Sequence, residues 1–256
     1  MIQEEDGGFY TSSEFDQLLA RLSIAHASDT LASLAYRQVV SVFELQANLL
    51  TILYKLQWLS AQRDHGLDDV TWMYFAASDV VAFHVVLRSL FDEVAEVAGC
   101  LAIQYGVVPQ SFHKLQQWIS KPGNRNRLGE PVAGVIASCD WFDAVRELRD
   151  DLVHRAATAI VFPHVDRILF QIHLGANRRV LIKPVMFNEH VADFTLYAAH
   201  VMVRLVAFLE QFAIAIMATD PVLADMTPMS IKRGHPGLGV LRAWSAALEL
   251  AIQAAG

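Results

Sequence analysis

One short segment of the chain combines an arginine, carboxylates and a histidine at spacings that suit acid–base chemistry. It reads Arg149-Asp150-Asp151-Leu152-Val153-His154. If the segment is helical, Asp150 and His154 share one face, and the carboxylate can fix the tautomer of the imidazole. The other ring nitrogen can then transfer a proton, while the planar guanidinium of Arg149 can hold two phosphate oxygens at once. The pattern therefore indicates proton transfer beside a phosphate group.

The same residues also have a purely structural interpretation. Arg146 and Asp150 are four residues apart and can form an ion pair on a helix face. A histidine near the end of a helix is favoured by the helix dipole. On a straight helix Arg149 and His154 would point roughly 140° apart. They can act on one atom only if the helix ends near His154, so both interpretations stay open.

The chain contains a second arginine five residues before a histidine, Arg21 and His26, but there the apolar Leu22 follows the arginine. A polar residue after the arginine distinguishes the segment 149–154. That segment resembles the signature of the HEPN superfamily, compact helical domains of which many are metal-independent ribonucleases. In that family an earlier core helix carries an acidic residue, and Asp92 matches that position. The resemblance covers roughly residues 30–220.

This resemblance implies roles for four residues. His154 would act as general base or acid, and Arg149 would hold the phosphate. Asp150 would set the imidazole tautomer, and Asp92 would orient Arg149 or tune His154. Such an enzyme cleaves RNA by using the 2′-hydroxyl of the RNA itself as the nucleophile. It needs no cofactor or metal and works as a homodimer.

A biological role in a toxin–antitoxin pair or in antiviral defence would fit the resemblance, with an antitoxin or another protein as partner. The alternative is a HEPN-like module without catalysis, used for protein interaction or nucleotide binding. A weaker alternative is an unrelated helical scaffold in which the segment 149–154 is accidental. The sequence does not choose between these.

The most basic stretch of the chain lies upstream of the motif. Residues 121–131 read KPGNRNRLGEP and predict a loop, because glycine, proline and asparagine interrupt regular structure. Lys121, Arg125 and Arg127 are the candidates for contacts with substrate phosphates. An ordinary soluble turn explains them equally well. The formal net charge of −7 confines any contact with single-stranded RNA or a nucleotide to such a local site.

The spacing of apolar residues predicts a mainly α fold, a helical bundle with a small antiparallel β insertion before the last core helix. Residues 1–29 would be an extension, 30–220 the bundle with its insertion at about 157–187, and 221–256 a linker and helix. The predicted helices and strands, given by residue range, are helices at 30–63, 69–105, 111–120, 141–155, 189–219 and 238–254, and strands at 159–162, 167–173 and 179–187, with a hairpin turn at 175–177.

The composition points to a protein with a large core. Of the 256 residues 54% are hydrophobic and 18% are charged. This composition gives more apolar surface than a small bundle buries, which predicts an oligomeric interface.

The most apolar run, 194–219, contains His200, Arg204 and Glu210, and so predicts an interior helix rather than a membrane span. The acidic N-terminus lacks the pattern of a signal peptide. With only two cysteines and no metal-ligand spacing, a cytoplasmic protein without membrane contact is expected.

Overall fold

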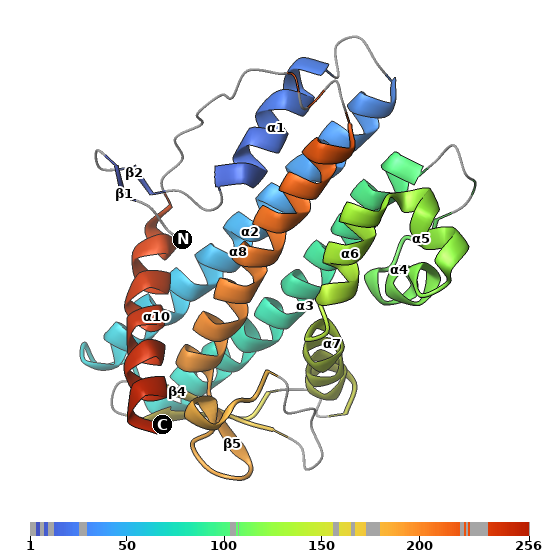
Figure 1. The fold of residues 1–256 in the computed structure, drawn as a ribbon. Coiled ribbons are helices and arrows are strands. Elements are labelled where there is room, and N and C mark those ends of the chain that lie inside the picture. Colours follow the sequence, from blue (N-terminus) through green and yellow to red (C-terminus); the bar gives the residue numbers. More distant parts are fainter. Residues whose placement is uncertain are drawn as a thin grey trace. The chain divides into compact units, whose positions relative to one another are not determined.

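In a computed structural model the chain is mainly helical, with a small antiparallel sheet placed before the helix α8 (Phe194–Thr219), which confirms the predicted fold class (Figure 1). The structure describes residues 4–5, 8–9, 13–25, 30–102, 106, 108–155, 159–164, 167–172, 180–220, 223, 225 and 235–255.

The chain divides into two compact units, each assembled from three stretches. The first comprises Met1–Gln46, Ser89–Asp140 and Leu205–Gly234, and the second comprises Ala47–Arg88, Trp141–Arg204 and His235–Gly256. Three of the five boundaries, after Gln46, Arg88 and Arg204, fall within long helices, and neither unit is a continuous segment of the sequence.

Two helices of 34 residues form as the periodicity predicts, α2 (Thr30–Arg63) and α3 (Asp69–Ala102). Gly66 lies in the turn between them with φ of 96°, a backbone conformation that only glycine adopts without strain. Residues 103–105, where α3 was expected to continue, lie outside the described part. A shorter helix, α1 (Ser13–Ala25), precedes α2, and a two-residue strand pair, β1 (Glu4–Glu5) with β2 (Gly8–Phe9), precedes α1.

The first unit also contains three short helices. They are α4 (Phe112–Ile119), which was predicted, α5 (Pro122–Leu128) and α6 (Glu130–Ser138). The prediction of a loop at 121–131 is therefore wrong. Proline is accommodated in the first turn of a helix, where its missing N–H is not needed, and Gly129 with φ of 93° separates α5 from α6. The rings of Phe91, Phe112 and Phe208 pack together in this unit, with centroids 4.8–5.7 Å apart.

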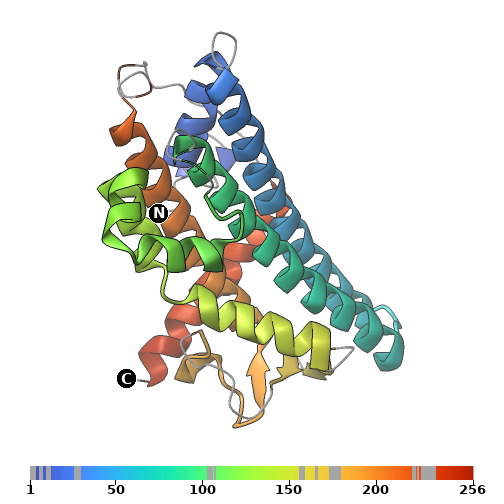
Figure 2. The same ribbon diagram turned by 90° about the vertical axis from the view of Figure 1, so that its right-hand side faces the viewer.

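The second unit holds the sheet, in the order β3 (Val161–His164), β4 (Arg167–Gln171) and β5 (Val191–Asp193) (Figure 2). Val161 pairs with Phe170, and Leu169 pairs with Asp193. The predicted hairpin between 167–173 and 179–187 is wrong, because β4 pairs with β3 and β5. Lys183–Val185 instead forms a short 3₁₀ turn, η3. The expected turn at 175–177 lies outside the described residues.

The helix α8 begins at Phe194, five residues later than predicted. Its cap is Asp193, because the Asp193 carboxylate accepts the backbone N–H of Thr195 at 2.9 Å and of Leu196 at 3.3 Å. The last helix is α10 (Pro236–Ala255), close to its predicted limits. It contacts η3 within the second unit.

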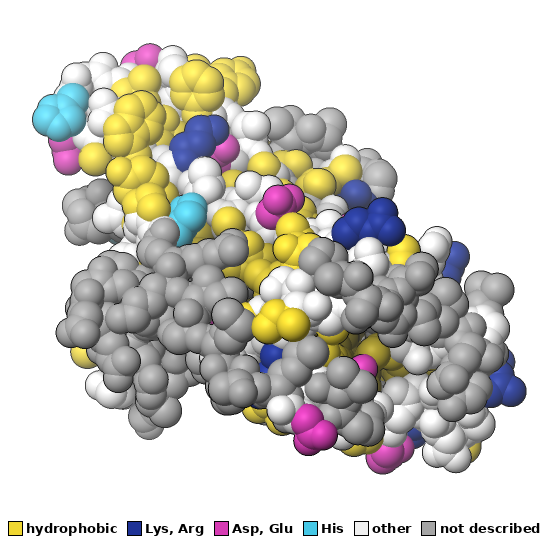
Figure 3. Space-filling view, turned by 90° about the horizontal axis from the view of Figure 1, so that it is seen from above, with side chains coloured by type: hydrophobic (Ala, Val, Ile, Leu, Met, Phe, Trp, Pro, Cys, Tyr) yellow, Lys and Arg dark blue, Asp and Glu magenta, His cyan; other side chains and the backbone are white. Residues whose placement is uncertain are grey.

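Three helices are long and apolar enough to cross a membrane, judged by length and composition: Ser33–Arg63, Asp69–Ala102 and Phe194–Thr219. In the most apolar 18-residue window of Phe194–Thr219, 61% is buried within the protein. On α2 and α3, four large aromatic side chains of the second unit are exposed: Tyr54, Trp58, Tyr74 and Phe75. Figure 3 shows hydrophobic side chains gathered on part of one face, with a few charged ones among them.

Candidate functional site

The motif 149–154 lies where one helix changes its geometry. The helix α7 (Phe142–Asp150) forms because Phe142, Val145 and Leu148 make one buried face. It continues directly into a π-helical turn, η2 (Asp151–Arg155). The predicted helix at 141–155 is thus present over nearly its full length, but its last turn is wider than an α-helical turn. Arg149 and Asp150 are the last two residues of α7, and His154 lies in η2.

The wider turn changes the angle between Arg149 and His154. In a π-helix the backbone hydrogen bonds join residues five apart, so such residues lie about one turn from each other. Three of the five steps from Arg149 to His154 fall within η2. The two backbone positions are therefore closer to one face than the roughly 140° of a straight α-helix. The His154 side chain lies outside the described part of the structure.

The carboxylate of Asp150 interacts with two arginines of its own helix. Arg149 Nη1 donates a hydrogen bond of 2.9 Å to Asp150 Oδ1, and Arg146 Nη1 lies 4.0 Å from Asp150 Oδ2. The expected ion pair between Arg146 and Asp150 is thus present, but its N–O distance is long. Arg146 Nε also lies 3.4 Å from Asp143 Oδ1. The bond to Asp150 therefore limits the orientations of the Arg149 guanidinium.

Asp92 belongs to the first unit, whereas Arg149 and His154 belong to the second. Its Oδ1 accepts the backbone N–H of Phe112 at 3.0 Å. This bond satisfies one of the N–H groups that the first turn of α4 cannot pair internally. The described hydrogen bond of Asp92 thus stabilises the start of a helix.

Lys121, Arg125 and Arg127 also lie in the first unit, at the start and within α5. Arg125 Nε donates to both oxygens of Glu130, at 2.7 and 2.9 Å, and Nη2 donates to Oε1 at 2.5 Å. These bonds lower the pKa of the Glu130 carboxyl, because they favour its charged form. Lys121 and Arg127 are exposed. Of the three proposed phosphate contacts, Arg125 already has a carboxylate partner.

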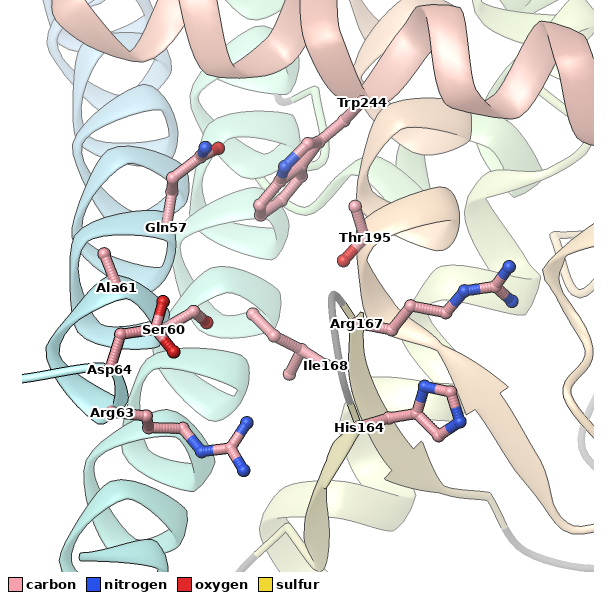
Figure 4. Close-up of a pocket in the computed structure, with 10 residues that line it drawn as sticks. All are labelled: Gln57, Ser60, Ala61, Arg63, Asp64, His164, Arg167, Ile168, Thr195 and Trp244. Carbon is pink, nitrogen blue, oxygen red and sulfur yellow. The ribbon is translucent and has the colours of Figure 1, made fainter. Parts of the chain in front are cut away.

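A polar cleft of about 250 Å³ lies within the second unit, and the sequence gave no sign of it (Figure 4). Its walls come from α2, from β3 and β4, from the first turn of α8 and from α10. The residues that line the cleft do not form one motif in the sequence, because α2 is about a hundred residues away from the strands and further from α10. Its lining residues are Gln57, Ser60, Ala61, Arg63, Asp64, His164, Arg167, Ile168, Thr195 and Trp244.

Among the described residues, no group of three or more histidines, cysteines, aspartates or glutamates is placed to hold a metal ion. Neither Cys100 nor Cys139 forms a disulfide bond. Comparisons with protein-family models, with curated proteins and with solved structures gave no match. Function is therefore inferred from the chemistry of the residues themselves.

Proposed function

We propose that the protein is a HEPN-like, metal-independent endoribonuclease. The observation that carries this proposal is the position of Arg149-Asp150-Asp151-Leu152-Val153-His154 across the change from α7 to the π turn η2. Widened turns of this kind occur frequently at functional sites. Here the widening brings the two positions that the chemistry needs closer to one face of the helix.

In the proposed reaction His154 accepts the proton of an RNA 2′-hydroxyl, and the 2′-oxygen attacks the adjacent phosphorus. The bond from phosphorus to the 5′-oxygen breaks, and that oxygen takes up a proton. The products are a 2′,3′-cyclic phosphate and a 5′-hydroxyl, so no oxidant, metal or cofactor enters the balance. Arg149 stabilises the negative charge that builds up on the phosphorane oxygens.

Asp150 supports this role of Arg149. An arginine has five N–H donors in a fixed plane, and the described bond to Asp150 occupies one of them. The carboxylate thereby limits the orientations of the guanidinium. A preorganised arginine stabilises a transition state better than one that must be ordered during the reaction.

A homodimer is part of the proposal, because each HEPN-like protomer would supply one motif to a shared cleft. The exposed aromatic side chains Tyr54, Trp58, Tyr74 and Phe75 support an interface with another protein surface. A toxin or an antiviral-defence role, with an antitoxin as partner, follows from the same resemblance. Lys121, Arg125 and Arg127 are the proposed contacts to the RNA backbone.

A second function is favoured by one specific contact. Because the charge of Arg149 is balanced by Asp150 on the same helix, the motif can also serve as a structural element of a HEPN-like module that binds a protein or a nucleotide without cleaving RNA. The assay that tests the first proposal decides between the two.

The experiment is cleavage of a single-stranded RNA by purified protein in EDTA. The wild-type protein should cut the RNA, and His154→Ala should abolish cutting. His26→Ala is the matched control, since it removes the histidine of the other Arg-x4-His pair and should leave the rate unchanged. Cleavage that is equal in wild type and His154→Ala would contradict the proposal.

A further inference from the structure

The polar cleft in the second unit has room for a small molecule. Its volume of about 250 Å³ equals that of roughly eight water molecules in the liquid. Pockets for drug-sized ligands are larger, about 300 to 1,000 Å³. The residues of the cleft are distinct from the motif on α7 and η2, so the inference does not depend on the proposed nuclease activity.

One wall of the cleft presents an arginine that is already held in place. Arg63 Nε donates to Asp69 Oδ1 at 2.9 Å, and the guanidinium carbon lies 5.4 Å from the centre of the Trp72 ring. Figure 4 shows the side chain extending from α2 towards the strands. The bond to Asp69 uses one of five N–H donors. Arg63 is therefore preorganised to bind an oxyanion, which arginine binds with two parallel hydrogen bonds.

The strand wall adds a second arginine. His164 of β3 and Arg167 of β4 are paired partners, and both side chains extend away from α2 in Figure 4. Arg167 Nε lies 3.6 Å from the buried Asp193 Oδ2, and the His164 ring packs against Phe187 with centroids 5.4 Å apart. Because Arg167 and His164 extend away from α2, Arg63 is the cationic side chain placed for direct contact with an anion.

The α2 wall carries a different chemistry next to Arg63. Gln57 and Ser60 are three residues apart on α2 and so share one helix face, and Asp64 lies in the turn directly after α2. Their carboxylate, amide and hydroxyl groups can accept or donate hydrogen bonds to hydroxyl groups. The carboxylate of Asp64 would repel a bare anion, but it suits a ligand that carries hydroxyls beside its charge. The indole of Trp244 closes this side with an apolar surface.

We propose that the cleft binds a phosphorylated sugar. Its phosphate contacts Arg63, its hydroxyls contact Asp64, Ser60 and Gln57, and its C–H face lies against Trp244. An arginine, a carboxylate and an indole around one small polar cavity match the three parts of such a molecule. Neither phosphate alone nor a neutral sugar alone uses all of them.

The test is isothermal titration calorimetry of the full chain with ribose 5-phosphate, inorganic phosphate and ribose. Ribose 5-phosphate should bind most tightly. Arg63→Gln should weaken its binding at least about tenfold, because a hydrogen bond to a charged group is lost. Arg37→Gln, on the same helix but exposed and outside the cleft, should leave binding unchanged. Asp64→Ala should weaken ribose 5-phosphate but not inorganic phosphate.

Three results would overturn the proposal: no binding of ribose 5-phosphate by the wild-type protein, equal losses in Arg63→Gln and Arg37→Gln, or inorganic phosphate binding as tightly as the sugar phosphate. If Arg63→Gln does not fold, Arg63→Lys keeps the charge and the ion pair to Asp69. It should still weaken binding, because an ammonium lacks the planar fork, and unchanged binding in Arg63→Lys would count against the site.

Discussion

At the scale of single residues, the clearest perturbation is that of His84 in the core of the second unit. Its side chain is fully buried. Nδ1–H donates to the carbonyl of Val80 at 2.7 Å, and Nε2 accepts from the hydroxyl of Tyr197 at 3.1 Å. The two rings stack with centroids 5.4 Å apart. Burial lowers the pKa of His84 from 6.5 to about 4, because the charged imidazolium would lose its hydration.

This lowered pKa predicts that the protein loses stability in mild acid. Between pH 6.5 and about 4 the unfolded chain binds a proton at His84 and the folded chain does not. The free energy of unfolding should fall by up to about 1.4 kcal/mol per pH unit in this window, and the contribution is absent above pH 6.5. Urea unfolding at pH 7.5 and pH 5 measures it.

The comparison needs two variants. His84→Gln should reduce the dependence of stability on pH in this window, whereas His190→Gln, which changes an exposed histidine, should not. The buried site makes His84→Gln less stable at every pH, so the slope against pH is the informative quantity. Equal slopes for the wild type and His84→Gln would show that His84 is not the responsible group.

At the scale of elements, the packing of α10 on α2 depends on one glycine. A Cβ placed on Gly237 would lie 2.1 Å from the backbone oxygen of Leu50, whereas a Cβ on Gly239 would meet nothing within 4 Å. The two helices approach too closely there for any side chain. Thr51 Oγ1 and His235 Nε2, 3.1 Å apart, connect the same two segments.

Two matched substitutions test this contact. Gly237→Ala should lower the free energy of unfolding by about 1–3 kcal/mol, as overpacking does. Gly239→Ala should raise it by up to about 1 kcal/mol, because alanine is the better helix former and its methyl group has space. Thermal and urea unfolding would check both values, and a neutral Gly237→Ala would mean that the two helices do not pack this closely.

Periodicity predicted the long helices well, because 34 residues of α2 give many repeats of one pattern. Short elements were harder to predict from the sequence. The segment of α5 contains glycine, proline and asparagine, yet it forms a helix with Pro122 in its first turn. The strand β5 has only three residues, and its pairing with β4 is a tertiary contact that no local pattern reveals. The π turn η2 has no sequence signal either.

The candidate site likewise has features that the sequence predicts and features that it does not. The motif 149–154 was visible as a linear pattern, and so was the Arg146–Asp150 pair. The contact between Arg149 and Asp150, two adjacent residues, depends on side-chain orientation and was not foreseen. The cleft could not be predicted at all, since Arg63, His164 and Trp244 come together only in the folded second unit.

At the scale of the whole molecule, the apolar content and the charged residues of the long helices bear on whether these helices enter a membrane. Three helices could cross a membrane by length and composition, yet they carry charged residues such as Asp79 and Arg204. Placing such a residue at the centre of a bilayer costs about 2.5–3.5 kcal/mol. We propose that these helices pack in the protein's own interior or in a protein interface rather than in a membrane.

Flotation with phospholipid vesicles tests this proposal. Protein expressed without detergent should remain in the dense fraction of the gradient after mixing with the vesicles, at low and at high salt. The charged residues within the three helices are the physical reason for this expectation. Protein that floats with the vesicles at both salt concentrations would show that the apolar helices enter the membrane.

The most direct test of the central claim is the chemistry of the RNA ends. In EDTA, wild-type protein should produce fragments with 2′,3′-cyclic phosphates and 5′-hydroxyls. His154→Ala and Arg149→Ala should produce none, and His26→Ala should produce them at the wild-type rate. Intact RNA with the wild-type protein, or the same fragments from His154→Ala, would contradict the assignment of this segment as the catalytic site of a metal-independent ribonuclease.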